Sequence, residues 1–158
     1  MKTIEYTSVD KSKYPTRGAW DNEPDKKQWQ DEETGLACLI HRGPVGALCG
    51  YVGVPEGHPY FKKSYNDIDH LEVHYGLTYS GLCQPGTDES KGICHLPDEG
   101  EPDHVWWLGF DCAHSDDFCP SYQKEAHSIY SSYKDIPFVE SECRGLAKQL
   151  LQVATNHE

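Results

Sequence analysis

The sequence predicts an α+β fold, with one antiparallel sheet, long loops, and one amphipathic helix packed on one face of the sheet. Short apolar segments separated by Gly- and Pro-rich turns predict the strands. Apolar residues recur at spacings of four and three over 138–156, which predicts a C-terminal helix. A chain of 158 residues suits one hydrophobic core, so we expect a single domain over 1–158.

Residues 1–34 are predicted to form an irregular lead-in, because they are mostly polar and include Pro15 and Pro24. Trp20 and Trp29 are expected to pin this lead-in onto the body of the domain. A solvated segment rarely contains two tryptophans, whose burial contributes on the order of a few kcal/mol.

Four segments are predicted to form the antiparallel sheet: 36–40, 47–54, 71–80 and 105–110. The first two are separated by Gly43-Pro44, the turn signal of a β-hairpin. The third is interrupted at Tyr75-Gly76, which indicates a bulge or a tight bend. The fourth is rich in aromatic strand formers. Between the third and the fourth, residues 81–103 are rich in Gly and Pro and predict a long loop.

The charge balance limits the partners of the chain. Fourteen basic residues face 26 acidic ones, and the formal net charge of −12 repels a DNA or RNA backbone. No apolar run reaches the roughly 20 residues needed to cross a bilayer, and the first residues lack the apolar segment of a signal peptide. We therefore expect a cytoplasmic protein with neither a nucleic-acid polymer nor a membrane as partner.

Seven cysteines are an odd number in a chain for which we expect no secretion, so a complete disulfide framework is not expected. Free thiols are the expectation, some of them buried and some available to a metal.

Reactive side chains gather directly after the aromatic strand, in the sequence D-C-A-H-S-D-D over 111–117. Loops at strand ends are where rigid scaffolds hold functional groups. We expect a functional pocket where this turn meets the loop at His58 and the bend at His74.

One interpretation of this pocket is a binding site for a planar ligand. Aromatic rings would stack on the ligand and a few polar groups would hold its edge, as in most small-molecule sites. The predicted ligand-binding residues are His58, Tyr60, His74, Thr78, Tyr79, Ser80, Trp106, Asp111, His114 and Asp117.

Catalytic interpretations also remain open. A metal held by imidazole and carboxylate groups would activate a water for hydrolysis of a phosphoester or an amide. The ligands would come from His74, Asp111, His114 and either Asp116 or Asp117. Alternatively, a Cys112 thiolate would act as a nucleophile with a nearby histidine as base.

No cofactor is fixed by these patterns, but zinc is the metal that the thiol and imidazole groups would suit. The paired C-x2-C spacing of structural zinc sites does not occur. The candidate zinc sets are Cys112, His114 and Cys119, or Cys83, Cys94 and His95.

Several longer motifs give a resemblance to a known family. They are G-A-W-D-N-E-P-D from Gly18, G-A-L-C-G-Y-V-G-V-P from Gly46, H-Y-G-L-T-Y from His74 and W-W-L-G-F-D-C-A-H from Trp106. In these motifs the chain resembles a family of small hypothetical proteins encoded by phages and prophages. The resemblance runs from about Gly18 to the C-terminal helix and implies a glycine at the position of Tyr75. It implies no defined activity, although small phage accessory proteins often act against host defence.

Our leading hypothesis is a non-enzymatic phage accessory protein that sequesters a small nucleotide-like ligand, an immune signal, and so counteracts host antiviral defence. One alternative is a metal-dependent hydrolase. Another is an acidic interaction protein that inhibits a host protein through its charge. The sequence leaves self-association open.

Overall fold

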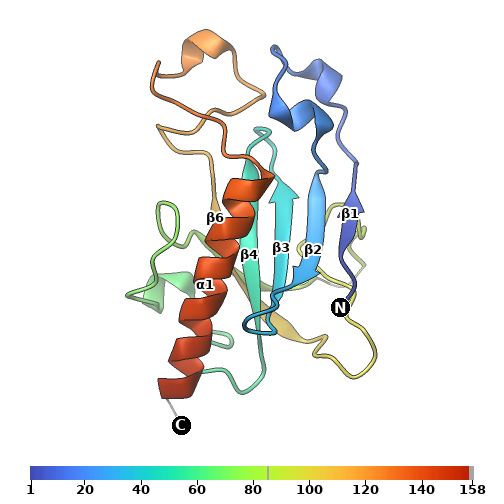
Figure 1. Cartoon of the computed structure of the whole chain (residues 1–158), viewed down its shortest axis with the longest axis vertical. Helices are drawn as coiled ribbons and strands as arrows, with labels where there is room; N and C mark the ends of the chain where they lie inside the picture. Colours follow the sequence, from blue (N-terminus) through green and yellow to red (C-terminus); the bar gives the residue numbers. More distant parts are fainter. Residues whose placement is uncertain (85, 157–158) are drawn as a thin grey trace.

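The structure is a computed structural model that describes residues 1–84 and 86–156. Within these residues, one antiparallel sheet has the strand order β1-β2-β3-β4-β6-β5, and helix α1 packs against it (Figure 1). The strands are β1 (Ile4–Tyr6), β2 (Lys26–Gln30), β3 (Ala37–Arg42), β4 (Leu48–Pro55), β5 (Tyr79–Leu82) and β6 (Val105–Asp111), and α1 spans Ile136–Asn156. Short 3-10 helices lie at Lys11–Lys13, Ala19–Asn22, Tyr65–Asp67 and Lys124–Ala126. The predicted α+β class is confirmed.

The hairpin predicted from two apolar segments is the centre of the sheet. Strands β3 and β4 pair along their lengths, and Gly46 in the turn between them has a φ of 85°, which a glycine adopts without strain. Strand β4 pairs on its other side with β6, the predicted aromatic strand. The sheet therefore has its most apolar strands in the middle and its shorter strands at the edges.

Helix α1 covers one face of this sheet. It begins two residues earlier than the predicted start, because Asp135 caps it by accepting a hydrogen bond from the Phe138 amide (3.1 Å). Pro137 lies in the first turn, where a missing N–H leaves no hydrogen bond unmade. The buried stripe of the helix consists of Val139, Cys143, Leu146, Ala147 and Leu150.

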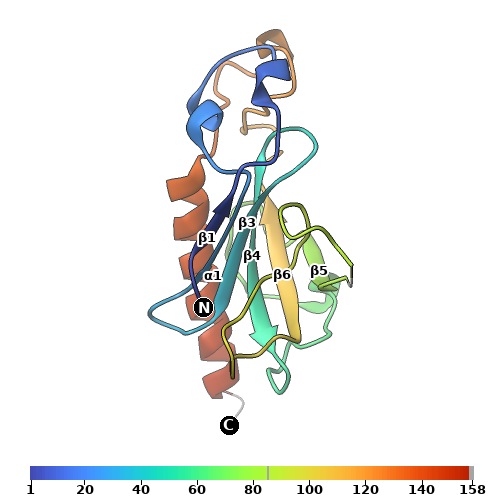
Figure 2. The same ribbon diagram turned by 90° about the vertical axis from the view of Figure 1, so that its right-hand side faces the viewer.

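The opposite face of the sheet is covered by the long connection between β5 and β6 (Figure 2). In this connection, the His95 ring meets the ring of buried Trp107 edge-on at 5.2 Å. The Gln28 side chain accepts a hydrogen bond from the Leu96 amide (2.8 Å) and donates to its carbonyl (3.1 Å). The predicted loop thus forms a second layer over β2 and β6.

The prediction of an irregular lead-in over 1–34 is wrong where β1 and β2 form. The segment K-K-Q-W-Q of β2 has no apolar signal because its inward side chains are polar and hydrogen-bonded. Gln28 is fully buried, and Lys26 donates to the Glu89 carbonyl. Trp20 is buried against Phe118 and Tyr133.

The prediction of a strand over 71–80 is wrong for most of its length. Only Tyr79–Leu82 pairs, as the edge strand β5. Upstream, His74 and Tyr75 form a turn in which Tyr75 and Gly76 both have positive φ, and consecutive left-handed residues break the strand geometry.

The cysteines divide into one disulfide and five free thiols within the described residues. Cys83 and Cys94 are bonded to each other, with their Cα atoms 4.9 Å apart. The proposed zinc set that uses these two sulfurs is therefore wrong.

A buried charge network holds the N-terminal segment to the sheet. Asp25 accepts hydrogen bonds from Lys11 Nζ (2.8 Å) and Arg42 Nε (2.7 Å), and from the backbone amides of Ser8 and Val9. The side chains of Asp25 and Arg42 are 1% and 0% exposed. Every charge in this network therefore has a partner that offsets its loss of water.

Among the described residues, helix α1 and the shorter helices offer no segment with the length and apolar character of a bilayer span.

Candidate functional site

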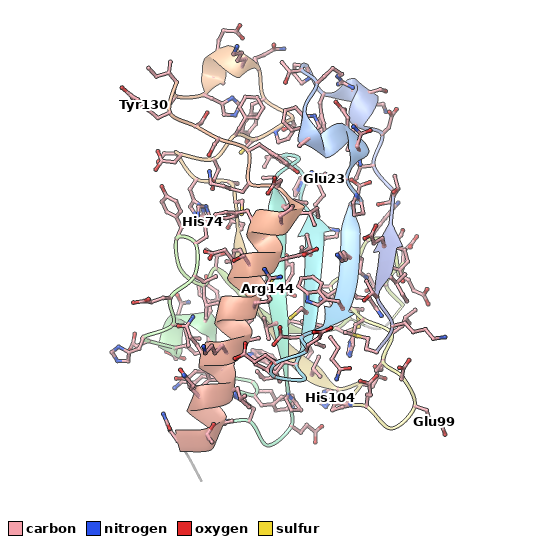
Figure 3. All side chains as sticks on the ribbon, viewed as in Figure 1. Glu23, His74, Glu99, His104, Tyr130 and Arg144 are labelled. Atoms are coloured by element: carbon pink, nitrogen blue, oxygen red, sulfur yellow. A yellow bond between two sulfur atoms is a disulfide. The ribbon has the colours of Figure 1, made fainter. Side chains whose placement is uncertain are left out.

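The candidate site lies at the C-terminal end of β6, beside the first turns of α1. Three segments meet there: the turn at 73–76, the segment that runs on from Asp111, the last residue of β6, and the segment before α1. Asp117 pairs with Ser132 in an isolated parallel bridge, which ties the second segment to the third. Figure 3 labels His74 beside the N-terminal part of α1, where its ring contacts Phe138 edge-on at 5.3 Å.

Asp117 is the centre of this site. Its side chain is fully buried, and both carboxylate oxygens lie 3.0 Å from His74 Nε2. The backbone amide of His114 donates to Oδ2 (3.0 Å), and Lys134 Nζ lies 3.0 Å from Oδ1. The carboxylate is therefore surrounded by donors from all three segments.

The electrostatics of Asp117 follow from these contacts. Burial raises the pKa of the carboxyl, but hydrogen bonds from the His114 amide, His74 and Lys134 oppose burial, and the net result is a lowered pKa. The group is thus held as a carboxylate, a form that both accepts hydrogen bonds and binds cations.

His114 links Asp117 to Asp111. Its Nδ1 lies 3.3 Å from Asp117 Oδ2 and 3.5 Å from Asp111 Oδ1. Asp111 itself accepts hydrogen bonds from the Thr78 hydroxyl (3.0 Å) and the Ala113 amide (3.1 Å). We call His74, His114 and Asp117 the His–Asp cluster, with Asp111 and Thr78 at its rim.

Tyr75 covers part of this cluster. Its φ of 56° lies in the left-handed region, which glycine adopts more easily, and this is the position where the resemblance implies a glycine. The ring stacks on His114 at 4.2 Å, and the hydroxyl donates to Asp116 (2.7 Å). Since Tyr75 is still 51% exposed, its ring forms the outer wall of the site.

The His–Asp cluster has the spacing of metal ligands. One ligand atom from each of its three residues lies within 4.8 Å of the others. Two of the separations, 3.0 Å from His74 Nε2 and 3.3 Å from His114 Nδ1 to Asp117 Oδ2, are near the roughly 3.4 Å between ligand atoms of tetrahedral zinc with bonds of about 2.1 Å. They are also hydrogen-bond distances, so a metal would replace these hydrogen bonds. Asp111 and Asp116, the other predicted ligands, are not part of this group.

Lys134 opposes cation binding. Its ammonium is held by the Ser132 hydroxyl (2.6 Å), the Ser132 carbonyl (2.9 Å) and the Asp116 carbonyl (3.1 Å), next to Asp117. A metal at the cluster would therefore bind near a fixed positive charge.

The other chemistries predicted at this turn do not fit. Cys112 is 1% exposed within the core, and burial raises the pKa of its thiol far above the ordinary value, so it is not a ready nucleophile. Neither Cys112 nor Cys119 joins a ligand group with His114 among the described residues.

The structure brings five of the ten predicted residues together and leaves five elsewhere. His74, Thr78, Asp111, His114 and Asp117 form the cluster and its rim. The expected convergence with the loop at His58 is wrong, because His58 follows β4, whose last residue pairs with the first residue of β6. His58 therefore lies at the opposite end of the sheet, where its Nε2 is 2.8 Å from the Leu150 carbonyl.

The predicted stacking residues also lie apart from the cluster. Trp106 donates its indole N–H to the Lys63 carbonyl (2.8 Å), and Tyr60 packs at the edge of the core under α1. The Ser80 hydroxyl accepts from the Tyr65 amide (3.1 Å). Tyr79 contacts Tyr51 edge-on at 5.3 Å, on the sheet face opposite α1.

Sequence reasoning missed two neighbours of the cluster, Tyr75 and Lys134. The resemblance marked Tyr75 as an exception, but no local signal assigned its ring to His114. Lys134 lies 17 residues after Asp117, and only the parallel bridge at Ser132 brings it back.

Comparisons with protein-family models, with curated proteins and with solved structures return no match to this chain.

Proposed function

We propose that the protein is a metal-dependent hydrolase whose metal is held by His74, His114 and Asp117. The observation that carries this proposal is the convergence of three ligand atoms within 4.8 Å beside the C-terminal end of β6. Two imidazoles and one carboxylate suit zinc, and three protein ligands leave a fourth position for water or substrate. The substrate class is a phosphoester or an amide.

In this proposal, the metal would lower the pKa of a bound water so that it attacks at neutral pH. Two other residues of the chain surround His114 in this site. Asp111 Oδ1 lies 3.5 Å from His114 Nδ1, the same nitrogen that faces Asp117, so Asp111 would lie beside the metal rather than support the ring through its other nitrogen. The Tyr75 ring excludes solvent from one face of His114.

Metal titration of the EDTA-treated protein tests the proposal. Zn²⁺ and Mn²⁺ are added, bound metal is measured by elemental analysis after desalting, and turnover is followed with p-nitrophenyl phosphate and bis(p-nitrophenyl) phosphate. We expect one bound metal per chain and metal-stimulated hydrolysis. His74→Ala and His114→Ala should lower the metal affinity by at least about tenfold.

His104→Ala is the matched control, because His104 is an exposed histidine that pairs with Glu56 at the far end of β6. A stoichiometry near zero would contradict the proposal, as would equal losses in His104→Ala and in the two cluster variants.

The ligand-sequestering function predicted from sequence is not supported by this cluster, because the expected aromatic residues lie elsewhere. It stays a prediction, as does its role against host defence.

A further inference from the structure

A groove crosses the sheet face opposite α1, away from the His–Asp cluster. Its apolar lining includes Tyr51, Tyr79 and Ile93, and its polar lining includes His41 and Lys91. We call it the tyrosine groove. Gln84, Thr87 and Gly92 also line it, and like Ile93 they lie between Cys83 and Cys94, which are joined by the disulfide.

The strand register brings the two tyrosines of the groove together. Gly109 of β6 is the partner of Tyr51 on one side and of Tyr79 on the other. A Cβ atom at Gly109 would lie 2.4 Å from Tyr51 Cδ1, so only a glycine lets the Tyr51 ring lie across β6. The two tyrosine rings therefore meet edge-on at 5.3 Å beside the open groove.

Positive charge marks one end of the groove. A second hollow, whose charged lining residues include Lys13, Arg42, Asp10 and Asp25, shares His41 and Lys91 with the tyrosine groove, so the two hollows adjoin. Arg42 is neutralised by Asp25. Lys13 and Lys91 are exposed and form no ion pair within the described part of the chain, although Asp10 and Asp88 lie within electrostatic range.

We propose that the tyrosine groove binds a small planar aromatic ligand that carries an anionic group, such as a nucleoside monophosphate. The ring would lie against the half-buried Tyr79, whose position is fixed by its edge-on contact with the buried Tyr51, since base–aromatic contact is favourable and tolerant of the base. The phosphate would lie between Lys13 and Lys91. Mostly apolar walls with a few polar groups at one end are typical of small-ligand sites.

A polymer is not the ligand that this groove favours. Lys13 and Lys91, which form no ion pair among the described residues, suit one phosphate group, whereas the net charge of −12 repels a long phosphate backbone. The charge distribution therefore favours binding of a small anion at this end of the groove over binding of a nucleic-acid polymer.

The test uses the full-length protein in EDTA, with adenosine 5′-monophosphate, adenosine and inorganic phosphate as probes in calorimetric titrations. We expect the monophosphate to bind more tightly than adenosine, and phosphate alone to bind weakest. Lys91→Gln should weaken monophosphate binding by about tenfold, the loss expected for one charged hydrogen bond, and leave adenosine binding unchanged.

Tyr79→Ala should weaken both the monophosphate and adenosine. Lys62→Gln, an exposed change outside the groove, should alter neither. Circular dichroism checks that Tyr79→Ala folds, and the surface change Lys91→Gln remains decisive if it does not.

Amide NMR signals locate the ligand independently of the proposed hydrolase. Signals of Gly92 and Ile93 should move on addition of the monophosphate, whereas those of His114 and Asp117 should stay. Binding should also survive His74→Ala. No binding at millimolar monophosphate, equal affinity for phosphate alone, or loss of binding in His74→Ala without loss in Lys91→Gln would each overturn the proposal.

Discussion

Tyr75 combines an unfavourable backbone with favourable side-chain contacts. A non-glycine residue in the left-handed region costs about 1–2 kcal/mol. The ring stack on His114 and the hydrogen bond to Asp116 offset this cost, because an aromatic pair contributes about 0.5–1.5 kcal/mol. The backbone cost and the side-chain contacts of Tyr75 therefore roughly cancel.

Tyr75→Gly should change the stability little but expose the ring of His114. We expect faster carbethoxylation of His114 by diethyl pyrocarbonate, followed by peptide mass spectrometry. Tyr130→Gly is the control, because Tyr130 is 82% exposed and contacts no ring among the described residues. An unchanged rate at His114 would show that the Tyr75 ring does not shield it.

Lys134 gives a second prediction at the scale of one residue. Lys134→Met removes the positive charge 3.0 Å from Asp117 and should raise the affinity of the His–Asp cluster for Zn²⁺. The metal-free variant should be less stable, because Asp117 loses a buried partner. Competition titration with a chromophoric chelator measures the affinity, and a lower affinity for Zn²⁺ than in the parent protein would count against the metal site.

At the scale of elements, the Asp25 network couples stability to pH. Burial raises the pKa of Asp25, but hydrogen bonds from Lys11, Arg42 and the Val9 amide outweigh it, and the pKa is lowered. A carboxyl with a lowered folded pKa stabilises the fold above its unfolded pKa, and this contribution is lost as the pH falls through the folded value. The loss from Asp25 should therefore begin below about pH 4.

Asp25→Asn should reduce the free energy of unfolding at pH 7 by about 3–5 kcal/mol, because it removes the buried counter-charge of Lys11 and leaves Arg42 with Glu23 at 3.5 Å. It should also flatten the decline of stability below pH 4. Urea unfolding at several pH values measures both effects, with the exposed Asp69→Asn as control. An unchanged acid slope in Asp25→Asn would assign the acid sensitivity to other carboxylates.

The loop from Cys83 to Cys94 gives a prediction about its disulfide. Thiol titration of the denatured protein should find five free cysteines before reduction and seven after it. Reduction should lower the stability by about 2–3 kcal/mol for a loop of this size, measured by urea unfolding with and without a dithiol. Cys83→Ser should show the lower stability and no response to the reductant. Seven free thiols before reduction would contradict the bond.

The elements that the sequence predicted are those with an apolar pattern. Strands β3, β4 and β6 and helix α1 bury continuous apolar stripes, which their sequences display. Strand β2 was missed because Lys26 and Gln28 face inward with hydrogen-bond partners that lie far away in the sequence. Such partners are set by the tertiary fold and leave no local signal.

The site was predicted only in part, because some of its residues are neighbours in sequence whereas others are brought together by the tertiary fold. Asp111, His114 and Asp117 lie close in sequence, so the sequence predicted that they are close in space. His74 was predicted to join them because an imidazole suits such a site. The position of His58 depended on strand direction, because antiparallel neighbours β4 and β6 send their following loops to opposite ends. Strand order was not available from the sequence.

For the whole molecule, the net charge is relevant to the predicted host partner, and the disulfide is relevant to the predicted cytoplasmic location. A net charge of −12 suits the alternative of an acidic protein that binds a basic host partner, which stays a prediction. A disulfide such as Cys83–Cys94 is rarely kept in a reducing cytosol. The predicted cytoplasmic location therefore requires a test of the bond in cells.

Strand β6 supports both proposed sites. Gly109 sets the tyrosine groove, and Asp111, two residues later on the same face, begins the rim of the His–Asp cluster. A shift of β6 by one residue against β4 would turn both side-chain sets to the opposite face. An insertion or deletion within β6 should thus abolish ligand capture and metal binding together, whereas a change of length in a loop should affect one of them alone.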